Sequence, residues 1–240
     1  MEMRPEFELL NSYFKSFLKI AVSTMDVAAT YLKLTMDPVF QEKSVPEAGG
    51  QPILVIPGFL IADPALIVMR AWLKRLGYRV FSSELQFNTK CPYAIAGLME
   101  EKLLDIYDEM GRPVIIIGYS LGGAVARYLA SKHSDKVKYI ITIGSPSLTT
   151  DKIDPFIYNL FRKFNPDCIE KCGCEFVNRL TARSSIPEML IYSKEDGVVH
   201  WSDSILNVPS ENCREVSGNH GELAVSPEVY RLIASRLRSD

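Results

Sequence analysis

The sequence has little of the residue that most often serves as a catalytic base. Its 240 residues include only three histidines, at positions 133, 200 and 220. Imidazole is the side chain most often used for general acid–base catalysis near neutral pH. An enzyme with this sequence that needs an imidazole therefore has three residues to draw on, and the choice depends on where each lies in the fold.

A surplus of either charge is also absent. Lysine and arginine number 27 and aspartate and glutamate 29, which gives a formal net charge of -2. Nucleic-acid-binding domains usually carry a clustered basic surface, so this balance gives no indication of a nucleic-acid partner. Hydrophobic residues make up 47% and charged residues 23% of the chain. These proportions indicate a globular protein with a sizeable core and exclude a disordered or fibrous chain.

Long hydrophobic runs are missing as well. The longest apolar stretch, 53–62, is interrupted by Pro57 and Gly58. It is far shorter than the roughly 20 residues that a spanning helix requires. The N-terminus carries acidic residues and no cleavage site of small residues, so we expect no signal peptide. A cytoplasmic location is expected on this basis.

Residues 7–34 have the spacing of an amphipathic helix, with apolar residues at steps of three and four. Such a helix packs on the body of a domain or lies in a membrane interface. We expect 1–45 to form an N-terminal helical segment, and a peripheral membrane contact stays open. The apolar positions are Phe7, Leu10, Phe14, Phe17, Leu18, Ala21, Met25, Ala28 and Leu32.

From residue 46 onward, short apolar runs alternate with helical patterns. Apolar runs without polar alternation are typical of strands buried on both faces. Their alternation with helices predicts a mostly parallel sheet of about six strands with helices on both faces. We therefore expect one α/β domain over 46–240. The expected strands are 53–57, 78–82, 114–118, 137–144, 188–193 and 212–217, and the expected helices are 64–76, 92–110, 121–132 and one that begins at Pro227.

The alternation is interrupted over residues 147–187. This insertion contains an amphipathic run in which Phe156 and Leu160 share one helical face. Insertions at this place in a sheet often build lids or substrate pockets. We expect a lid or cap before the strand at 188–193, with a core-facing helix as the alternative.

The most informative motif is GYSLGG at 118–123. It follows an apolar strand and opens a helical run, which is the strand–turn–helix setting of a nucleophile elbow. In such a turn a strained backbone projects the serine hydroxyl from the edge of the sheet. Gly118 and Gly122 supply the small residues that the crowded turn needs. Ser120 is the expected nucleophile.

A serine hydroxyl is a weak nucleophile until a base accepts its proton. His220 follows the 212–217 strand and precedes the last helix, which places it at the same sheet edge as Ser120. His133 lies at the far end of the helix that follows Ser120. We expect His220 to be the base, with His200 as the reserve.

An acid that orients the histidine should lie on the loop after the strand at 188–193. Glu195 and Asp196 both follow this strand. We favour Asp196, because Gly197 permits the turn that aims its carboxylate inward. The order Ser120, Asp196, His220 is then that of an α/β-hydrolase.

Acyl transfer also needs two N–H donors for the developing oxyanion. We expect the backbone N–H of Leu121, directly after the nucleophile, and that of Phe59, in the turn that follows the first strand. Phe59 is also expected to line an acyl pocket. Further substrate contacts are expected from Leu60, Tyr119, Phe156, Leu160 and Val199.

These motifs together resemble the α/β-hydrolase superfamily, and within it the compact bacterial lipases and esterases. The resemblance covers about 50–238 and rests on ILVIPGF, GYSLGGAVARYLA, VKYIITIGSP, YSKEDGVV and GNHGEL followed by SPEVYRLIASRL. It implies hydrolysis of carboxylic esters through an acyl-serine, without metal or organic cofactor. Pro57 stands where many relatives have histidine, and 147–150 depart from the usual lipase pattern.

The cysteines do not indicate a metal site. Cys168, Cys172 and Cys174 lie close together, but a zinc site needs four ligands and usually two such pairs. An odd count of five leaves at least one thiol without a partner in the chain. We expect free thiols in a reducing compartment, or a lid disulfide if the protein is exported.

Three functions fit the sequence. The first is a serine esterase or lipase, the second an acyltransferase that uses the same acyl-serine, and the third a non-catalytic binding protein. The complete Ser-Asp-His set disfavours the third. The expected partner is a small-molecule or lipid ester and not a nucleic acid, and the chain is expected to be a monomer or a homodimer. Membrane contact through the N-terminal helix or the lid stays open.

Overall fold

A six-stranded sheet in the order β2-β1-β3-β4-β5-β6 forms the centre of the molecule. The computed structural model describes residues 25–43, 48–60, 66–85, 88–147, 152–168, 176, 178–180, 185–206 and 208–239. All neighbouring strands pair in parallel, which confirms the expected α/β class. The strands are β1 (Pro52–Ile56), β2 (Arg79–Ser82), β3 (Val114–Tyr119), β4 (Val137–Ile143), β5 (Glu188–Tyr192) and β6 (Cys213–Glu215).

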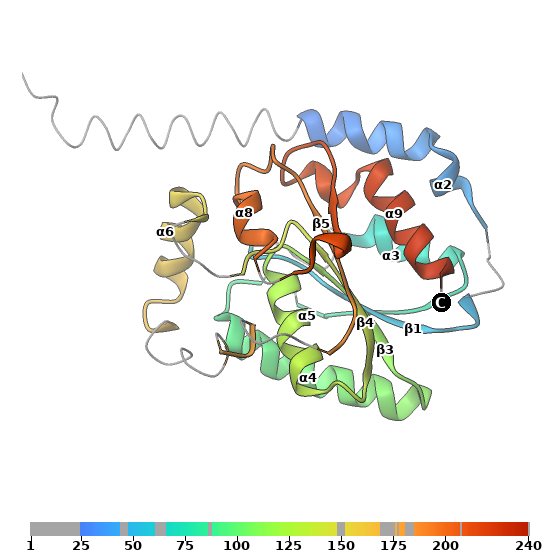
Figure 1. The fold of residues 1–240 in the computed structure, drawn as a ribbon, viewed down its shortest axis with the longest axis horizontal. Coiled ribbons are helices and arrows are strands. Elements are labelled where there is room, and N and C mark those ends of the chain that lie inside the picture. Colours follow the sequence, from blue (N-terminus) through green and yellow to red (C-terminus); the bar gives the residue numbers. More distant parts are fainter. Residues whose placement is uncertain are drawn as a thin grey trace, which may run out of the picture.

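Helices cover both faces of the sheet (Figure 1). α3 (Ile67–Arg75) and α9 (Pro227–Arg238) pack on one face, and α4 (Pro92–Met110) and α5 (Leu121–Lys132) pack on the other. Along β1, Ile53 and Val55 point into the first core while Leu54 and Ile56 point into the second. Successive side chains of a strand point to opposite faces, so a strand covered on both sides must be apolar throughout.

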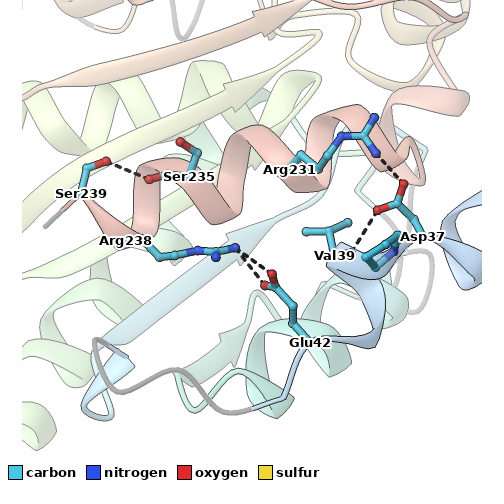
Figure 2. Close-up of a pocket in the computed structure, with 8 residues that line it drawn as sticks. Asp37, Val39, Glu42, Arg231, Ser235, Arg238 and Ser239 are labelled. Atoms are coloured by element: carbon cyan, nitrogen blue, oxygen red, sulfur yellow. Dashed lines mark hydrogen bonds and ion pairs between the residues drawn. The ribbon is translucent and has the colours of Figure 1, made fainter.

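The described part of the N-terminal segment shares its core with this sheet. It comprises a helix over 25–36, called here the N-terminal helix, and α2 (Pro38–Gln41). Leu34 and Val39 join the core on the α3 and α9 side, and the Trp72 indole N–H donates to the Val39 carbonyl at 2.9 Å. Figure 2 shows the pocket between this segment and α9, where Arg231 pairs with Asp37 and Arg238 with Glu42.

The N-terminal helix packs through a different face from the one that its apolar spacing emphasises. Thr30 and Leu34 are buried, whereas Met25, Leu32 and Met36 are exposed by 76%, 58% and 78%. The exposed stripe continues the spacing noted for 7–34, of which 7–24 lie outside the described residues. Within the described ranges no helix is long and apolar enough to cross a membrane. Peripheral membrane contact stays a prediction.

The amphipathic run of the insertion forms the helix α6 (Pro155–Phe164). Residues 176 and 178–180 of the insertion are also helical, and Phe176 and Leu180 are buried in the core. None of the residues of α6 is fully buried, so it is not the core-facing helix considered as the alternative. Figure 1 shows it at the side of the molecule, away from the helices that cover the sheet. The residues just before α6 pair with the loop after β5. Ile153 and Val199 form an antiparallel bridge, and the His200 N–H donates to the Lys152 carbonyl at 2.9 Å. The action of α6 as a lid stays a prediction.

A buried ion pair joins α5 to the start of β5. The Arg127 guanidinium lies 2.9 Å from Glu188 Oε1, and the Thr142 hydroxyl donates to the same oxygen at 2.6 Å. Arg127 also donates to the Pro146 carbonyl at 3.3 Å, in the loop after β4. The pair therefore fixes three segments of the sheet edge relative to one another.

We expect Arg127→Ala to lower the free energy of unfolding by about 3–5 kcal/mol, because it leaves the Glu188 carboxylate buried without its cation. Urea denaturation followed by circular dichroism measures this loss. Arg79→Ala is the matched control, because the Arg79–Glu109 pair is exposed and such pairs contribute about 1 kcal/mol or less. Equal losses in the two variants would contradict the argument.

Candidate active site

Ser120 lies in the tight turn between β3 and α5. Its backbone has φ 53° and ψ -125°, a strained conformation for a residue with a side chain. The turn needs glycine two positions before and two positions after Ser120: a Cβ at Gly118 would lie 2.5 Å from the Gly122 carbonyl oxygen, and one at Gly122 would lie 2.2 Å from the Ile56 carbonyl oxygen. This is the geometry that the GYSLGG motif predicted for an elbow.

The turn after β1 lies directly against Ser120. A Cβ at Gly58 would come 2.6 Å from the Ser120 Cβ and 3.1 Å from its Oγ. Phe59 follows Gly58 in this turn, and Leu121 begins α5 on the other side of Ser120. The two residues expected to donate N–H groups to an oxyanion thus flank the hydroxyl, and their role as donors stays a prediction.

Asn88 holds this turn in place and was not found from the sequence. The Asn88 side-chain NH₂ donates to the Pro57 carbonyl at 3.0 Å, and the Asn88 backbone carbonyl accepts the Leu60 N–H at 2.8 Å. Asn88 is completely buried, and Leu60 has a φ of 59°. Two bonds from one residue therefore fix both ends of the Pro57–Leu60 turn. No motif marks Asn88, because its role depends on a segment about 30 positions away.

His220 and Asp196 form a hydrogen-bonded pair at the carboxyl edge of the sheet. His220 Nδ1 lies 2.6 Å from Asp196 Oδ2, and the two side chains are only 12% and 2% exposed. The other carboxylate oxygen, Oδ1, accepts the N–H groups of Val198 and Val199 at 2.8 and 2.9 Å. These two bonds lock the carboxylate in the orientation that faces the imidazole.

The competing acid Glu195 is placed differently. Its carboxylate is on the exposed side of the loop, where it accepts the Gly218 N–H at 2.7 Å. The other two histidines also have partners elsewhere. His133 Nε2 lies 2.7 Å from Glu100, and His200, at the start of α8 (Trp201–Ser204), lies 2.9 Å from the Ser202 hydroxyl.

Gly144 leaves the space that the His220–Asp196 pair occupies. Gly144 follows β4 with φ 53°, and a Cβ there would lie 3.1 Å from Asp196 Oδ2 and 3.3 Å from His220 Nδ1. Only glycine allows this approach without strain. Sequence reasoning did not single out Gly144, although the run IGSP after β4 contains it.

The Tyr119 side chain packs against His220. Its ring lies 5.2 Å from the imidazole, and its hydroxyl donates to the His220 carbonyl at 2.5 Å. Burial, together with the nearby Asp196 carboxylate, raises the pKa of Tyr119 far above its ordinary value, so the phenol stays protonated and keeps donating. Tyr119 was expected to contact substrate. The structure places its buried side chain against His220 instead.

Comparison with known proteins agrees with this arrangement. A family model described as the alpha/beta hydrolase fold matches residues 101–190, the stretch from α4 through the elbow to β5. The chain has the α/β-hydrolase fold. This confirms the resemblance seen in the sequence at the level of the superfamily fold. None of the curated proteins matches the chain in sequence.

Solved structures with this hydrolase fold include three that superpose over most of the chain. A metagenome-derived lipolytic enzyme is 14% identical, with a TM-score of 0.61 and coverage of 82% of this chain and 100% of that chain. A carboxylesterase of Nitrososphaera gargenis is 16% identical, with a TM-score of 0.57 and coverage of 80% of this chain and 91% of that chain. A Bacillus licheniformis lipase is 16% identical, with a TM-score of 0.51 and coverage of 84% of this chain and 96% of that chain. At these identities the likeness shows the fold alone.

On this hydrolase fold, α6 contacts the Pro57–Leu60 turn through aromatic rings. The Phe59 ring packs edge-on against Phe161 and Phe164, with centroids 5.3 and 6.3 Å away. Phe156 and Leu160, expected to contact substrate, lie on the same helix and are half-buried. Leu60 lies in the Pro57–Leu60 turn, whereas Val199 is buried and its N–H serves Asp196. Their substrate contacts stay predictions.

Free thiols or a disulfide were expected of the cysteines, and the described residues contain both. Cys91, at the start of α4, is disulfide-bonded, while Cys168 and Cys213 are free thiols whose pKa values are raised by burial. Cys172 and Cys174 lie outside the described residues. Disulfides are typical of oxidising compartments, so the cysteines do not support the cytoplasmic location expected from the sequence. Among the described residues, no group of three His, Cys, Asp or Glu side chains is arranged to hold a metal ion.

Proposed function

We propose that this protein is a serine hydrolase that cleaves carboxylic esters through an acyl-serine intermediate. The observation that carries the proposal is the combination of a strained Ser120 at the start of α5 with the His220–Asp196 pair at the same sheet edge. Tyr119 links the two, because it precedes Ser120 in the chain and contacts His220 in space. Nucleophile, base and orienting acid are the three parts that acyl transfer through serine requires.

The first half of the reaction forms the acyl-serine. Asp196 accepts a hydrogen bond from the Nδ1–H of His220 without taking its proton, and this tautomer leaves Nε2 with a lone pair to accept the proton of the Ser120 hydroxyl. Ser120 Oγ then attacks the ester carbonyl carbon, and the carbonyl oxygen becomes an oxyanion. His220 next gives its proton to the leaving alcohol oxygen as the carbon–oxygen bond breaks. In the second half, His220 takes a proton from a water molecule whose oxygen attacks the acyl carbon. The bond between that carbon and Ser120 Oγ then breaks, His220 returns the proton to Ser120 Oγ, and the carboxylic acid leaves.

The negative charge that develops on the carbonyl oxygen needs fixed donors. The backbone N–H groups of Leu121 and Phe59 are proposed for this role, from the two segments that flank Ser120. Leu121 is also the first residue of the 12-residue helix α5, whose N-terminal dipole favours negative charge. Preorganised donors of this kind are often the largest contribution to catalysis of acyl transfer.

The proposed substrate class is an uncharged ester with an apolar acyl group. The aromatic contact between Phe59 and α6 puts apolar surface beside the proposed oxyanion site. The structural relatives include a lipolytic enzyme, a carboxylesterase and a lipase, which supports an ester over other acyl compounds. The net charge of -2 gives no field that would favour a polyanionic substrate.

The test is hydrolysis of a series of p-nitrophenyl esters, from acetyl to palmitoyl, with and without a lipid interface. We expect short-chain esters to be cleaved and a fluorophosphonate probe to label the protein. Adding an alcohol acceptor separates hydrolysis from acyl transfer, because a transferase makes a new ester. Deleting 153–164 tests the lid, and rates on micellar and monomeric esters that the deletion leaves unchanged would count against gating. A wild-type protein that neither cleaves an ester nor takes the label would overturn the proposed function.

A further inference from the structure

The loop that carries His220 is bound on one side by the N-terminal helix. The Thr30 hydroxyl donates to Glu222 Oε1 at 2.6 Å, across 192 positions of sequence. Thr30 is only 7% exposed, so this bond is shielded from water on the helix side. A second contact from the same helix is longer, with Asp26 Oδ2 at 3.4 Å from the Asn219 amide nitrogen. The N-terminal helix lies outside both the family match and the sequence resemblance.

Glu222 transmits this contact to the residue before His220. Glu222 Oε2 accepts the backbone N–H of Asn219 at 2.8 Å, and Asn219 Oδ1 accepts the backbone N–H of Glu222 at 3.2 Å. This reciprocal arrangement has the spacing and bonds of a capping box, and it closes the turn over Asn219–Glu222 that leads into the short 3-10 helix Glu222–Ala224. His220 lies between its two members. The box therefore sets the direction in which the chain presents the imidazole.

Two further bonds to the loop come from the hydrolase body. Glu195 accepts the Gly218 N–H at 2.7 Å, and Tyr119 donates to the His220 carbonyl at 2.5 Å. Gly218 has φ 115°, and a Cβ there would lie 3.3 Å from Glu222 Oε2, so the loop closes tightly over the Glu222 carboxylate. Glu222 is thus held between the His220 loop and Thr30.

We propose that Thr30 is a positioning residue for the base His220, acting through Glu222 and Asn219. The Thr30 hydroxyl is the donor found for Glu222 Oε1 among the described residues. When the Thr30 hydroxyl is removed, Glu222 Oε1 is left half-buried without a hydrogen-bond donor. The carboxylate then recovers a donor by turning towards water. Turning releases the Asn219 N–H from Oε2 and loosens the backbone next to His220. The inference rests on the proposed function, because it concerns the base of that reaction.

The expected size of the effect follows from how strictly a proton transfer depends on geometry. A displacement of a catalytic group by 1 Å can cost about 10²-fold in rate. Loss of one of several bonds to the loop should displace the imidazole by less than this. We therefore expect Thr30→Val to lower kcat by about tenfold, with KM changed by less than about twofold, because ground-state binding of the ester does not use His220.

The experiment separates positioning from stability by counting active sites. Fluorophosphonate titration gives the fraction of molecules with a working Ser120, and kcat is expressed per labelled site. Thr30→Val removes the hydroxyl and nearly keeps the shape, whereas Thr30→Ser keeps the hydroxyl and should restore kcat. Thr35→Val is the matched control, because the Thr35 hydroxyl bonds only the Leu32 carbonyl of the same helix, and its kcat per site should equal that of the wild type.

Each outcome bears on the proposal. Wild-type kcat per labelled site in Thr30→Val would overturn it, as would a loss that Thr30→Ser fails to restore. If Thr30→Val does not fold, Glu222→Ala replaces it as the test, because alanine offers no acceptor to the Thr30 hydroxyl or to the Asn219 N–H; an unchanged kcat per site there would overturn the proposal equally. A wild type without label or esterase activity would instead defeat the proposed function and this inference with it.

Discussion

Replacing Ser120 by alanine is expected to lower kcat for ester hydrolysis by at least about 10³-fold and to abolish labelling by a fluorophosphonate. The change removes the oxygen that forms the acyl-enzyme and leaves the rest of the turn in place. Alanine keeps the Cβ that already fits at φ 53°, and the backbone bond from residue 120 to the Ile143 carbonyl needs no side chain. The loss should therefore fall on kcat, with the fold intact.

Labelling and p-nitrophenyl ester hydrolysis measure this effect, and circular dichroism verifies the fold. Ser131→Ala is the matched control on the same helix, because the Ser131 hydroxyl bonds only the Tyr128 carbonyl near the far end of α5. That variant should keep both the label and the rate. Full activity in Ser120→Ala would contradict the acyl-serine mechanism, whatever else in the site survives.

The second large effect is expected from Asp196→Asn, with a loss in kcat of about 10⁴-fold. Oδ1 of Asp196 accepts two backbone N–H groups, from Val198 and Val199. In the asparagine variant the amide oxygen must keep these two donors, so the NH₂ group faces His220 Nδ1. The imidazole then has to accept a hydrogen bond at Nδ1 and carry its proton on Nε2. In that tautomer it has no lone pair for the proton of Ser120.

Glu195→Gln is the variant to compare with Asp196→Asn, because Glu195 was the competing acid in the sequence. The Glu195 carboxylate contacts the Gly218 N–H, and a glutamine carbonyl can accept the same bond. We expect kcat to change by less than about tenfold, since the imidazole tautomer is untouched. A loss in Glu195→Gln as large as in Asp196→Asn would contradict the assignment of Asp196 as the orienting acid.

The architecture was predictable because the burial of each strand shows in the apolar character of its own residues. β1, β3 and β4 are covered by helices on both faces, so nearly every position is apolar and the runs stand out without any knowledge of neighbours. The elbow was predictable for a similar reason. The clashes that demand glycine at 118 and 122 involve the turn's own backbone and that of adjacent β1.

The supports of the site were not predictable from local pattern. Asn88 acts on the Pro57–Leu60 turn, Gly144 clears space for the His220–Asp196 pair, and Thr30 reaches Glu222 across 192 positions. Tyr119 was expected to contact substrate. Alternation along β3 turns its side chain to the opposite face, under His220. In each case the contact depends on a segment distant in sequence.

The sequence by itself determined the class of fold, the order of the strands along the chain and the residue at the tight turn, because hydrophobic burial and steric crowding act on neighbouring residues. It also narrowed three histidines to His220 by the rule that loops after parallel strands meet at one edge. Only the tertiary structure decided that Asp196 rather than Glu195 faces that histidine, and that the N-terminal helix packs through Thr30 and Leu34. Those choices depend on hydrogen bonds and packing between segments that meet only after the sheet has formed.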